Sequence, residues 1–135
     1  MTTPKLTKAD LSQFTGSQEF FVYPLGRLIL TEGVRHLAEA AGAYWLIDAI
    51  ASYQADPRIA GNRMLRDIQF WRLAVVGGRG VLTCREDSGR EPVISQQIEF
   101  TDFPLDEVEI WLEWGGIPTP DGRLAGFVAM LPSER

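Results

Sequence analysis

The chain of 135 residues contains one histidine and one cysteine, which limits the chemistry that its side chains can perform. His36 would need an orienting partner and a nucleophile to act as a general base. It lies beside Arg35, off the apolar stripe of its predicted helix, so we expect it at the surface. Cys84 lies inside a predicted strand, where a small buried hydrophobe is the better interpretation than a reactive thiolate. One histidine and one cysteine also cannot build a structural zinc site of the usual type.

Asp48 is the only charged residue between Glu39 and Asp56. Burying its carboxylate without a partner would cost several kcal/mol or keep it protonated. We therefore expect that it either reaches solvent beside Trp45 or pairs with an arginine in the range 58–72, and we favour this structural role over a functional acid. If the domain instead has a ligand pocket, the expected lining is Tyr44, Trp45, Asp48 and Arg72.

A row of acidic residues with one tryptophan alternates with apolar residues near the C-terminal end. Glu107, Glu109, Trp111 and Glu113 are two residues apart and so share one side of a predicted strand. Clustered carboxylates can ligate a hard cation, but the same pattern is typical of a solvated face. An exposed tryptophan among carboxylates suits the docking of a basic partner, and we predict neither a metal site nor a cofactor.

The elements that must position these residues follow from the hydrophobic periodicity. Val34, Leu37, Ala38 and Ala41 predict one buried helical face, with Thr31 as its N-cap and Gly42 as its end. A second helix continues to Gln54, and two consecutive helices over about 31–54 result. From Ile68 to Leu131 the period becomes two, with short connections, which predicts a mostly antiparallel meander. The fold class is therefore α+β, with the two helices packed on the sheet.

Glycine-rich segments and short apolar runs predict the turns and the N-terminal elements. Gly77-Gly78-Arg79-Gly80 lies between two predicted strands and does not match a phosphate-binding loop, so it predicts a hairpin. Residues 115–122 are rich in glycine and proline and predict a loop. At the N-terminal side, Phe20–Tyr23 and Leu28–Thr31 predict a short hairpin, preceded by a short helix capped by Thr7.

Length and composition set the broad class. The length predicts a single domain over 1–135. No apolar run reaches the roughly 18 residues of a membrane span, and no signal peptide is apparent, so we expect a cytoplasmic protein without membrane contact. The net charge of -5 makes direct nucleic-acid binding unexpected and is compatible with a basic partner surface.

Several segments resemble a bacterial family of domains of unknown function, found mainly in plasmid, phage and integrated-element settings. The segments are 13–17, 24–27, 70–73, 83–84, 100–105, 131–134 and the long block from Leu30 to Ser52. The resemblance brings no assigned activity and no catalytic residues. It implies an accessory protein of mobile elements, because such small proteins often act on host machinery.

The leading hypothesis is a non-enzymatic, acidic protein-binding module that uses the face around Trp111 or a groove beside Tyr44 and Trp45. An anti-defence protein that occupies a basic surface of a nuclease or CRISPR complex is its specific form. The alternative is a small enzyme or small-ligand-binding domain with a pocket near the second helix. Self-association through a sheet edge is a third possibility, so the sequence leaves open whether the chain forms a homo-oligomer.

Overall fold

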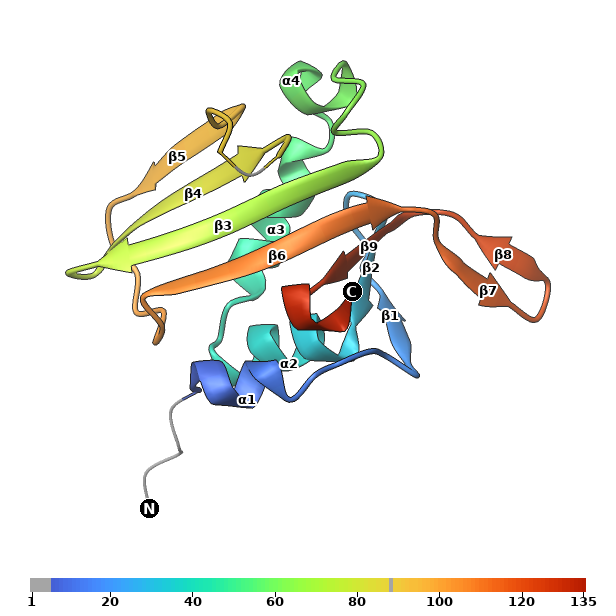
Figure 1. The fold of residues 1–135 in the computed structure, drawn as a ribbon, viewed down its shortest axis with the longest axis horizontal. Coiled ribbons are helices and arrows are strands. Elements are labelled where there is room, and N and C mark those ends of the chain that lie inside the picture. The colour runs from blue at the N-terminus through green and yellow to red at the C-terminus, as the bar shows by residue number, and fades with distance from the viewer. Residues whose placement is uncertain (1–5, 88) are drawn as a thin grey trace.

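A computed structural model of the chain describes residues 6–87 and 89–135. Four helices, nine strands and a final 3₁₀ turn follow one another in the described part (Figure 1). The N-terminal half comprises α1 (Lys8–Ser12), β1 (Phe20–Val22), β2 (Leu28–Thr31), α2 (Glu32–Ala40), α3 (Tyr44–Tyr53) and α4 (Pro57–Ala60). The C-terminal half comprises β3 (Ile68–Val76), β4 (Arg79–Arg85), β5 (Ile94–Ile98), β6 (Glu107–Trp114), β7 (Ile117–Thr119), β8 (Gly122–Leu124), β9 (Phe127–Met130) and η1 (Pro132–Glu134).

Seven strands form the main sheet, in the order β1-β2-β9-β6-β3-β4-β5. All neighbours are antiparallel except β2 and β9, which are parallel. The α+β class and the mostly antiparallel sheet are thus confirmed, but the meander is wrong. After the edge strand β5 the chain returns to the middle of the sheet, where β6 pairs with β3. Val108, Ile110 and Leu112 of β6 are buried there, in the core cluster that includes residues of α2 and α3.

The two expected consecutive helices are present. Thr31 caps α2 by accepting a hydrogen bond from the N–H of Val34, and Gly42 separates α2 from α3 with a φ of +60°. At this φ a residue with a Cβ is strained, so the break occurs at the one residue that tolerates it. The short helix predicted after Thr7 is present as α1, with the Thr7 side chain accepting from the Asp10 N–H, and one further short helix, α4, is added. No helix among the described residues has the length and apolar character needed to cross a membrane.

The core lies between the α2–α3 layer and one face of the sheet, with α3 behind β3 in Figure 1. Its centre contains Trp71, which is 1% exposed and packs against Tyr53 of α3. A buried amide joins the same two layers: Gln69 is 0% exposed and exchanges side-chain hydrogen bonds with Gln54. The Trp71 indole N–H also donates to Gln69.

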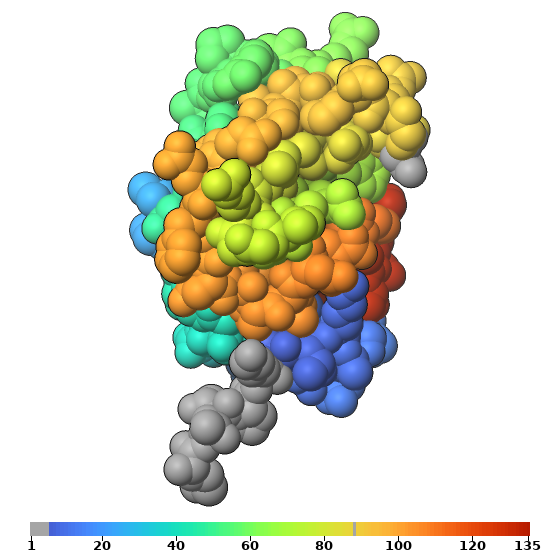
Figure 2. All heavy atoms as spheres, turned by 90° about the vertical axis from the view of Figure 1, so that its left-hand side faces the viewer, coloured from blue at the N-terminus to red at the C-terminus, as the bar shows by residue number. Residues whose placement is uncertain are grey.

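The predicted glycine- and proline-rich loop is instead a second, two-stranded sheet formed by β7 and β8. In Figure 1 this hairpin extends away from the main sheet beyond the end of β6. At the opposite end, the turn between β3 and β4 lies beside the connection from β5 to β6, and Figure 2 looks onto these two segments. The Thr101 N–H donates to the Gly78 carbonyl and fixes them together.

Candidate functional site

The face of the sheet opposite α2 and α3 carries side chains from four neighbouring strands. We call it the open sheet face and define it by Phe70 and Arg72 of β3, Arg85 of β4, Glu109, Trp111 and Glu113 of β6, and Val128 and Met130 of β9. The strand register aligns these residues: Phe70 lies between Arg85 and Trp111, and Arg72 lies beside Glu109. The predicted alternation is confirmed for 107–113, because Val108, Ile110 and Leu112 are buried, but it fails at Trp114, which is exposed.

The middle of the open sheet face is hollowed. A cavity of about 680 Å³ is lined by Phe70 and Trp111, by the guanidinium-bearing Arg72, Arg85 and Arg135, and by Glu109, Asp87 and Gly89. The two aromatic rings meet edge to face, with centroids 5.2 Å apart. The predicted Arg72, Glu109 and Trp111 therefore lie together. Glu107 and Glu113 line neighbouring hollows on either side.

The row of carboxylates on β6 is not a uniformly acidic surface, because arginines interleave with it. Arg72 donates a hydrogen bond to Glu107 and thereby lowers the pKa of that carboxyl group. Glu113 forms an ion pair with Arg135 at 3.4 Å. Both pairs are about half exposed, so each contributes little to stability. Among the described residues no group of three histidine, cysteine or acidic side chains is arranged to hold a metal ion.

Trp111 holds an unsatisfied donor. Its indole Nε1 is buried and has no hydrogen-bond acceptor among the described residues. A buried N–H without an acceptor costs roughly 1–3 kcal/mol. The Arg135 guanidinium lies 6.0 Å from the Trp111 ring centroid, within the range of a weak cation–π contact. Since Arg135 is exposed, its displacement would uncover the ring at little cost.

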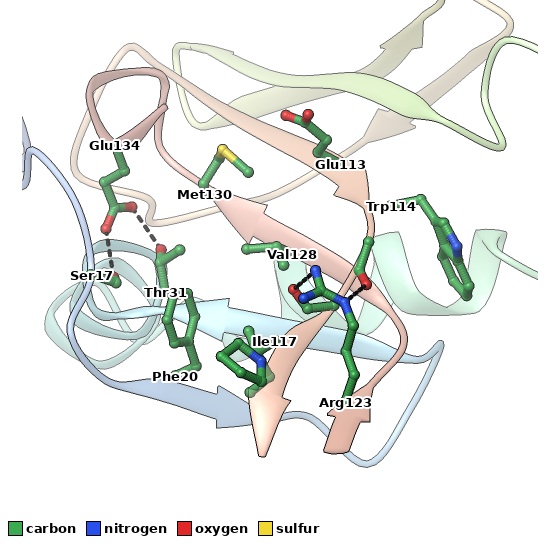
Figure 3. A pocket seen from close by; sticks show the side chains of 13 residues that line it. Ser17, Phe20, Thr31, Glu113, Trp114, Ile117, Arg123, Val128, Met130 and Glu134 are labelled. Atoms are coloured by element: carbon green, nitrogen blue, oxygen red, sulfur yellow. Dashed lines mark hydrogen bonds between the residues drawn. The ribbon is translucent and has the colours of Figure 1, made fainter. Parts of the chain in front are cut away.

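A second hollow adjoins the first along the sheet and has a volume of about 360 Å³ (Figure 3). Phe20, Val128, Met130 and Ile117 supply most of its apolar lining, and the β7–β8 hairpin forms one wall. Arg123 fixes the base of that hairpin by donating from its guanidinium to the carbonyls of Gly115 and Gly116.

Glu134 closes the other end of this hollow and fulfils a structural role. Its carboxylate accepts hydrogen bonds from Thr31 Oγ1 at 2.6 Å and from the Gly33 N–H at 3.1 Å, and also from Ser17 and the Leu131 N–H. The positive end of the helix dipole of α2 therefore already has its anion. Gly33 is needed because a Cβ there would lie 2.5 Å from the carboxylate.

The residues predicted around the second helix do not form one pocket. Tyr44 and Asp48 are exposed on α3, whereas Arg72 lies on the open sheet face, with the sheet between them. Of the two expectations for Asp48, its exposure to solvent is confirmed and its pairing with an arginine is wrong: its carboxylate accepts a hydrogen bond from the Tyr23 hydroxyl. The β1–β2 hairpin brings Tyr23 to α3, a contact between elements that the local sequence does not reveal.

Tyr23 and its neighbours form an aromatic cluster on the helix side. Burial, and then the hydrogen bond to Asp48, raise the pKa of Tyr23 to about 12. The ring of Tyr44 stacks on that of Tyr23 with centroids 6.3 Å apart, and Trp45 is half-buried against the core. This arrangement stabilises the contact between β1–β2 and α3.

His36 and Cys84 lie where the sequence predicted. His36 is exposed on α2, with its ring 5.3 Å from that of Phe14. Cys84 is buried in β4, and burial raises the pKa of its thiol to about 12. The thiol therefore stays protonated at neutral pH.

Sequence reasoning missed Phe70, Arg85 and Arg135 as members of the site. The alternation of β3 places Phe70 and Arg72 on the same side, and this signal pointed to Phe70. Arg85 and Arg135 join them only through the strand order, which the sequence did not reveal.

A search of curated proteins and a search of solved structures each found no match to this chain. A family described as a family of unknown function, DUF6876, matches residues 5–135. The match covers nearly the whole chain, including both hollows of the open sheet face. The chain therefore belongs to the DUF6876 family of unknown function.

Proposed function

We propose that this protein is a non-enzymatic binding module that captures a protein partner on its open sheet face. The observation that carries the proposal is the pair of adjoining hollows, one lined by aromatic rings and arginines and the other apolar. Tryptophan and arginine are enriched among the residues that dominate binding energy at protein interfaces. An apolar anchor of the partner enters the hollow beside the β7–β8 hairpin, and a second segment lies across Phe70 and Trp111.

The buried Nε1 of Trp111 supports this role, because a polar group of the partner that reaches it would supply the missing acceptor. The charges on the open sheet face also bear on which charged groups the partner surface would carry. Arg72, Arg85 and Arg135 line the larger hollow together with Asp87 and Glu109, while Glu107 and Glu113 beside it pair with Arg72 and Arg135. We therefore propose a partner surface with a basic group for Glu109 and an acidic group for Arg85.

The specific form of this proposal is a cytoplasmic accessory protein of mobile genetic elements that occupies a surface of a host defence nuclease. The small size, the net charge of -5 and the resemblance described in the sequence analysis motivate it, whereas the DUF6876 match assigns no role. The test adds the purified protein to nuclease assays of defence systems from the source organism. We expect loss of cleavage with the wild type, and undiminished cleavage in every such assay would overturn this form.

The binding role is tested by affinity capture with quantitative mass spectrometry, followed by direct titration of the captured partner. Glu109→Arg reverses an exposed charge in the larger hollow and should weaken binding by at least tenfold. Glu39→Arg makes the same charge reversal on α2, on the helix side of the molecule, and should leave binding unchanged. Circular dichroism would verify that both variants are folded.

Two results would contradict the proposal. A partner whose affinity is insensitive to Glu109→Arg but lost in Glu39→Arg would place the interface on the helix side. Failure to retain any protein above the level of a tag-only control would remove the binding role itself.

A further inference from the structure

Strand β5 ends the main sheet, with β4 on its inner side. No other described strand pairs with its outer side, and Figure 1 shows β5 at the margin of the sheet. In Figure 2 the amber-to-orange atoms of this region reach the surface between α4 and the β3–β4 turn. The backbone of β5 therefore has one side that is accessible to another strand.

The turn between β3 and β4 determines which residues of β5 direct their backbone groups outward. Gly77 and Gly78 have φ values of +59° and +75°, as in a two-residue hairpin turn closed by the pair Val76 and Arg79. Hydrogen-bonded pairs alternate along an antiparallel ladder. Gly80, Leu82 and Cys84 consequently direct their backbone groups toward β5, where they face Ile98, Gln96 and Ile94. The N–H and C=O groups of Ser95 and Gln97 point outward.

This edge lacks the usual protection against strand pairing. Edge strands are commonly blunted by charged side chains, proline or very short length. Strand β5 has five residues, Ile-Ser-Gln-Gln-Ile, without a charge or a proline, and both Ser95 and Gln97 are exposed. The opposite edge strand, β1, is shorter, with three residues.

The sequence of β5 reads nearly the same in both directions. We propose that β5 pairs with β5 of a second copy of this chain, antiparallel and centred on Gln96. Ser95 then lies opposite Gln97 of the second copy, and Ile94 lies opposite Ile98. Because Ser95 and Gln97 both present outward donors and acceptors, the two-fold arrangement forms four backbone hydrogen bonds. Like residues meet on each face, and no charge is buried.

The proposed dimer extends the sheet across two copies. An antiparallel edge pairing has its two-fold axis perpendicular to the sheet, so both helix layers lie on one side. The two open sheet faces then join into one surface on the other side. Because a five-residue edge buries less area than a stable interface of about 1,000 Å², we expect association that depends on concentration.

Sedimentation equilibrium of the full chain tests the proposal. With increasing concentration, the wild-type mass should rise from the 15.1 kDa of one chain toward twice that value. Ser95→Glu with Gln97→Glu places like charges opposite each other at two symmetry-related positions and should weaken dimerisation roughly tenfold. Ser95→Glu with Gln97→Lys is the matched control, since the same positions then attract, and it should dimerise at least as tightly as the wild type.

Hydrogen exchange of the wild type gives a second measurement that does not depend on the variants. The amides of Ser95 and Gln97 should become more protected at high concentration, while those of β1 should not change. A mass of one chain up to about 1 mM, the limit of weak specific association, would overturn the proposal. Equal dimerisation of the two double variants, or unchanged exchange at Ser95 and Gln97, would do so as well.

Discussion

Glu134 accepts four hydrogen bonds: two come from Thr31 and Gly33 at the start of α2, one from Ser17, and one from the Leu131 N–H of its own turn. Hydrogen bonds to a charged acceptor are stronger than neutral ones, and a carboxylate is favoured at a helix N-terminus. A Cβ at residue 33 would lie 2.5 Å from the carboxylate, so the Glu134 side chain would have to shift and its hydrogen bonds would be disturbed. Two residues 101 positions apart in the chain therefore depend on each other.

We expect Glu134→Ala to lower the free energy of unfolding by about 2–3 kcal/mol, because four donors lose a charged acceptor. Gly33→Ala should also destabilise the wild type, although alanine normally favours a helix by about 1 kcal/mol over glycine. In the Glu134→Ala background, Gly33→Ala should lower the free energy of unfolding much less than it does in the wild type, since the closest clash is gone. Urea denaturation of the four proteins measures this coupling, and strictly additive effects would contradict it.

The free energy of unfolding should depend on pH through Tyr23, because its hydroxyl group loses a proton at high pH. Its pKa is about 12 in the folded chain against an ordinary value of 10.0, so the folded state holds this proton more tightly. The stabilisation is complete below pH 10 and is lost as the pH rises toward 12. We expect the urea midpoint of the wild type to fall more between pH 9 and 11.5 than that of Tyr23→Phe. An identical fall in both proteins would contradict this assignment.

At the level of single residues, the sequence predicted those features that depend on near neighbours. The Thr31 cap, the break at Gly42 and the burial of Cys84 are all confirmed. The partner of Asp48 was wrong, because Tyr23 lies 25 residues away and arrives through the packing of a hairpin on a helix. No periodicity within either segment encodes that contact.

Among the elements, strand identity was predictable but strand order was not. Period-two patterns identified β3, β4, β5 and β6, yet the step from β5 to β6 was taken as another turn of a meander. Phe103 and Leu105 in that connection are buried, which lets the chain pass back to the centre of the sheet. The order of the strands determines which strands are neighbours, and therefore which side chains lie together on one face. The sequence therefore could not predict that the arginines of the open sheet face lie together.

The β7–β8 hairpin depends on one of two adjacent glycines. Gly116 has a φ of +87°, and a Cβ there would lie 1.9 Å from the Leu124 carbonyl oxygen. Gly115 has no such contact, since the nearest atom would be Arg123 Nη2 at 3.8 Å, an ordinary van der Waals distance. We expect Gly116→Ala to remove amide-exchange protection across 117–124, whereas Gly115→Ala should preserve it. Equal protection in the two variants would show that the hairpin does not need this close approach.

For the whole molecule, the two layers are joined by apolar packing and by the buried Gln69 amide. Gln69 accepts from the Trp71 indole and from Gln54, and it donates to Gln54 and to the Leu65 carbonyl. These bonds connect β3, α3 and the segment after α4. A buried polar network that is fully satisfied rigidifies a core, whereas a partly satisfied one is costly.

We expect Gln69→Leu to lower the free energy of unfolding by about 2–4 kcal/mol, because the Trp71 N–H and the Leu65 carbonyl lose their partner inside the core. Gln97→Leu, on the exposed side of β5, is the matched control. It should change the free energy of unfolding by less than about 0.5 kcal/mol. Since Gln69 links both layers, helix content by circular dichroism and tryptophan fluorescence should shift together. A variant whose two transitions separate would show that the helices and the sheet unfold independently, and that the amide pair does not join them.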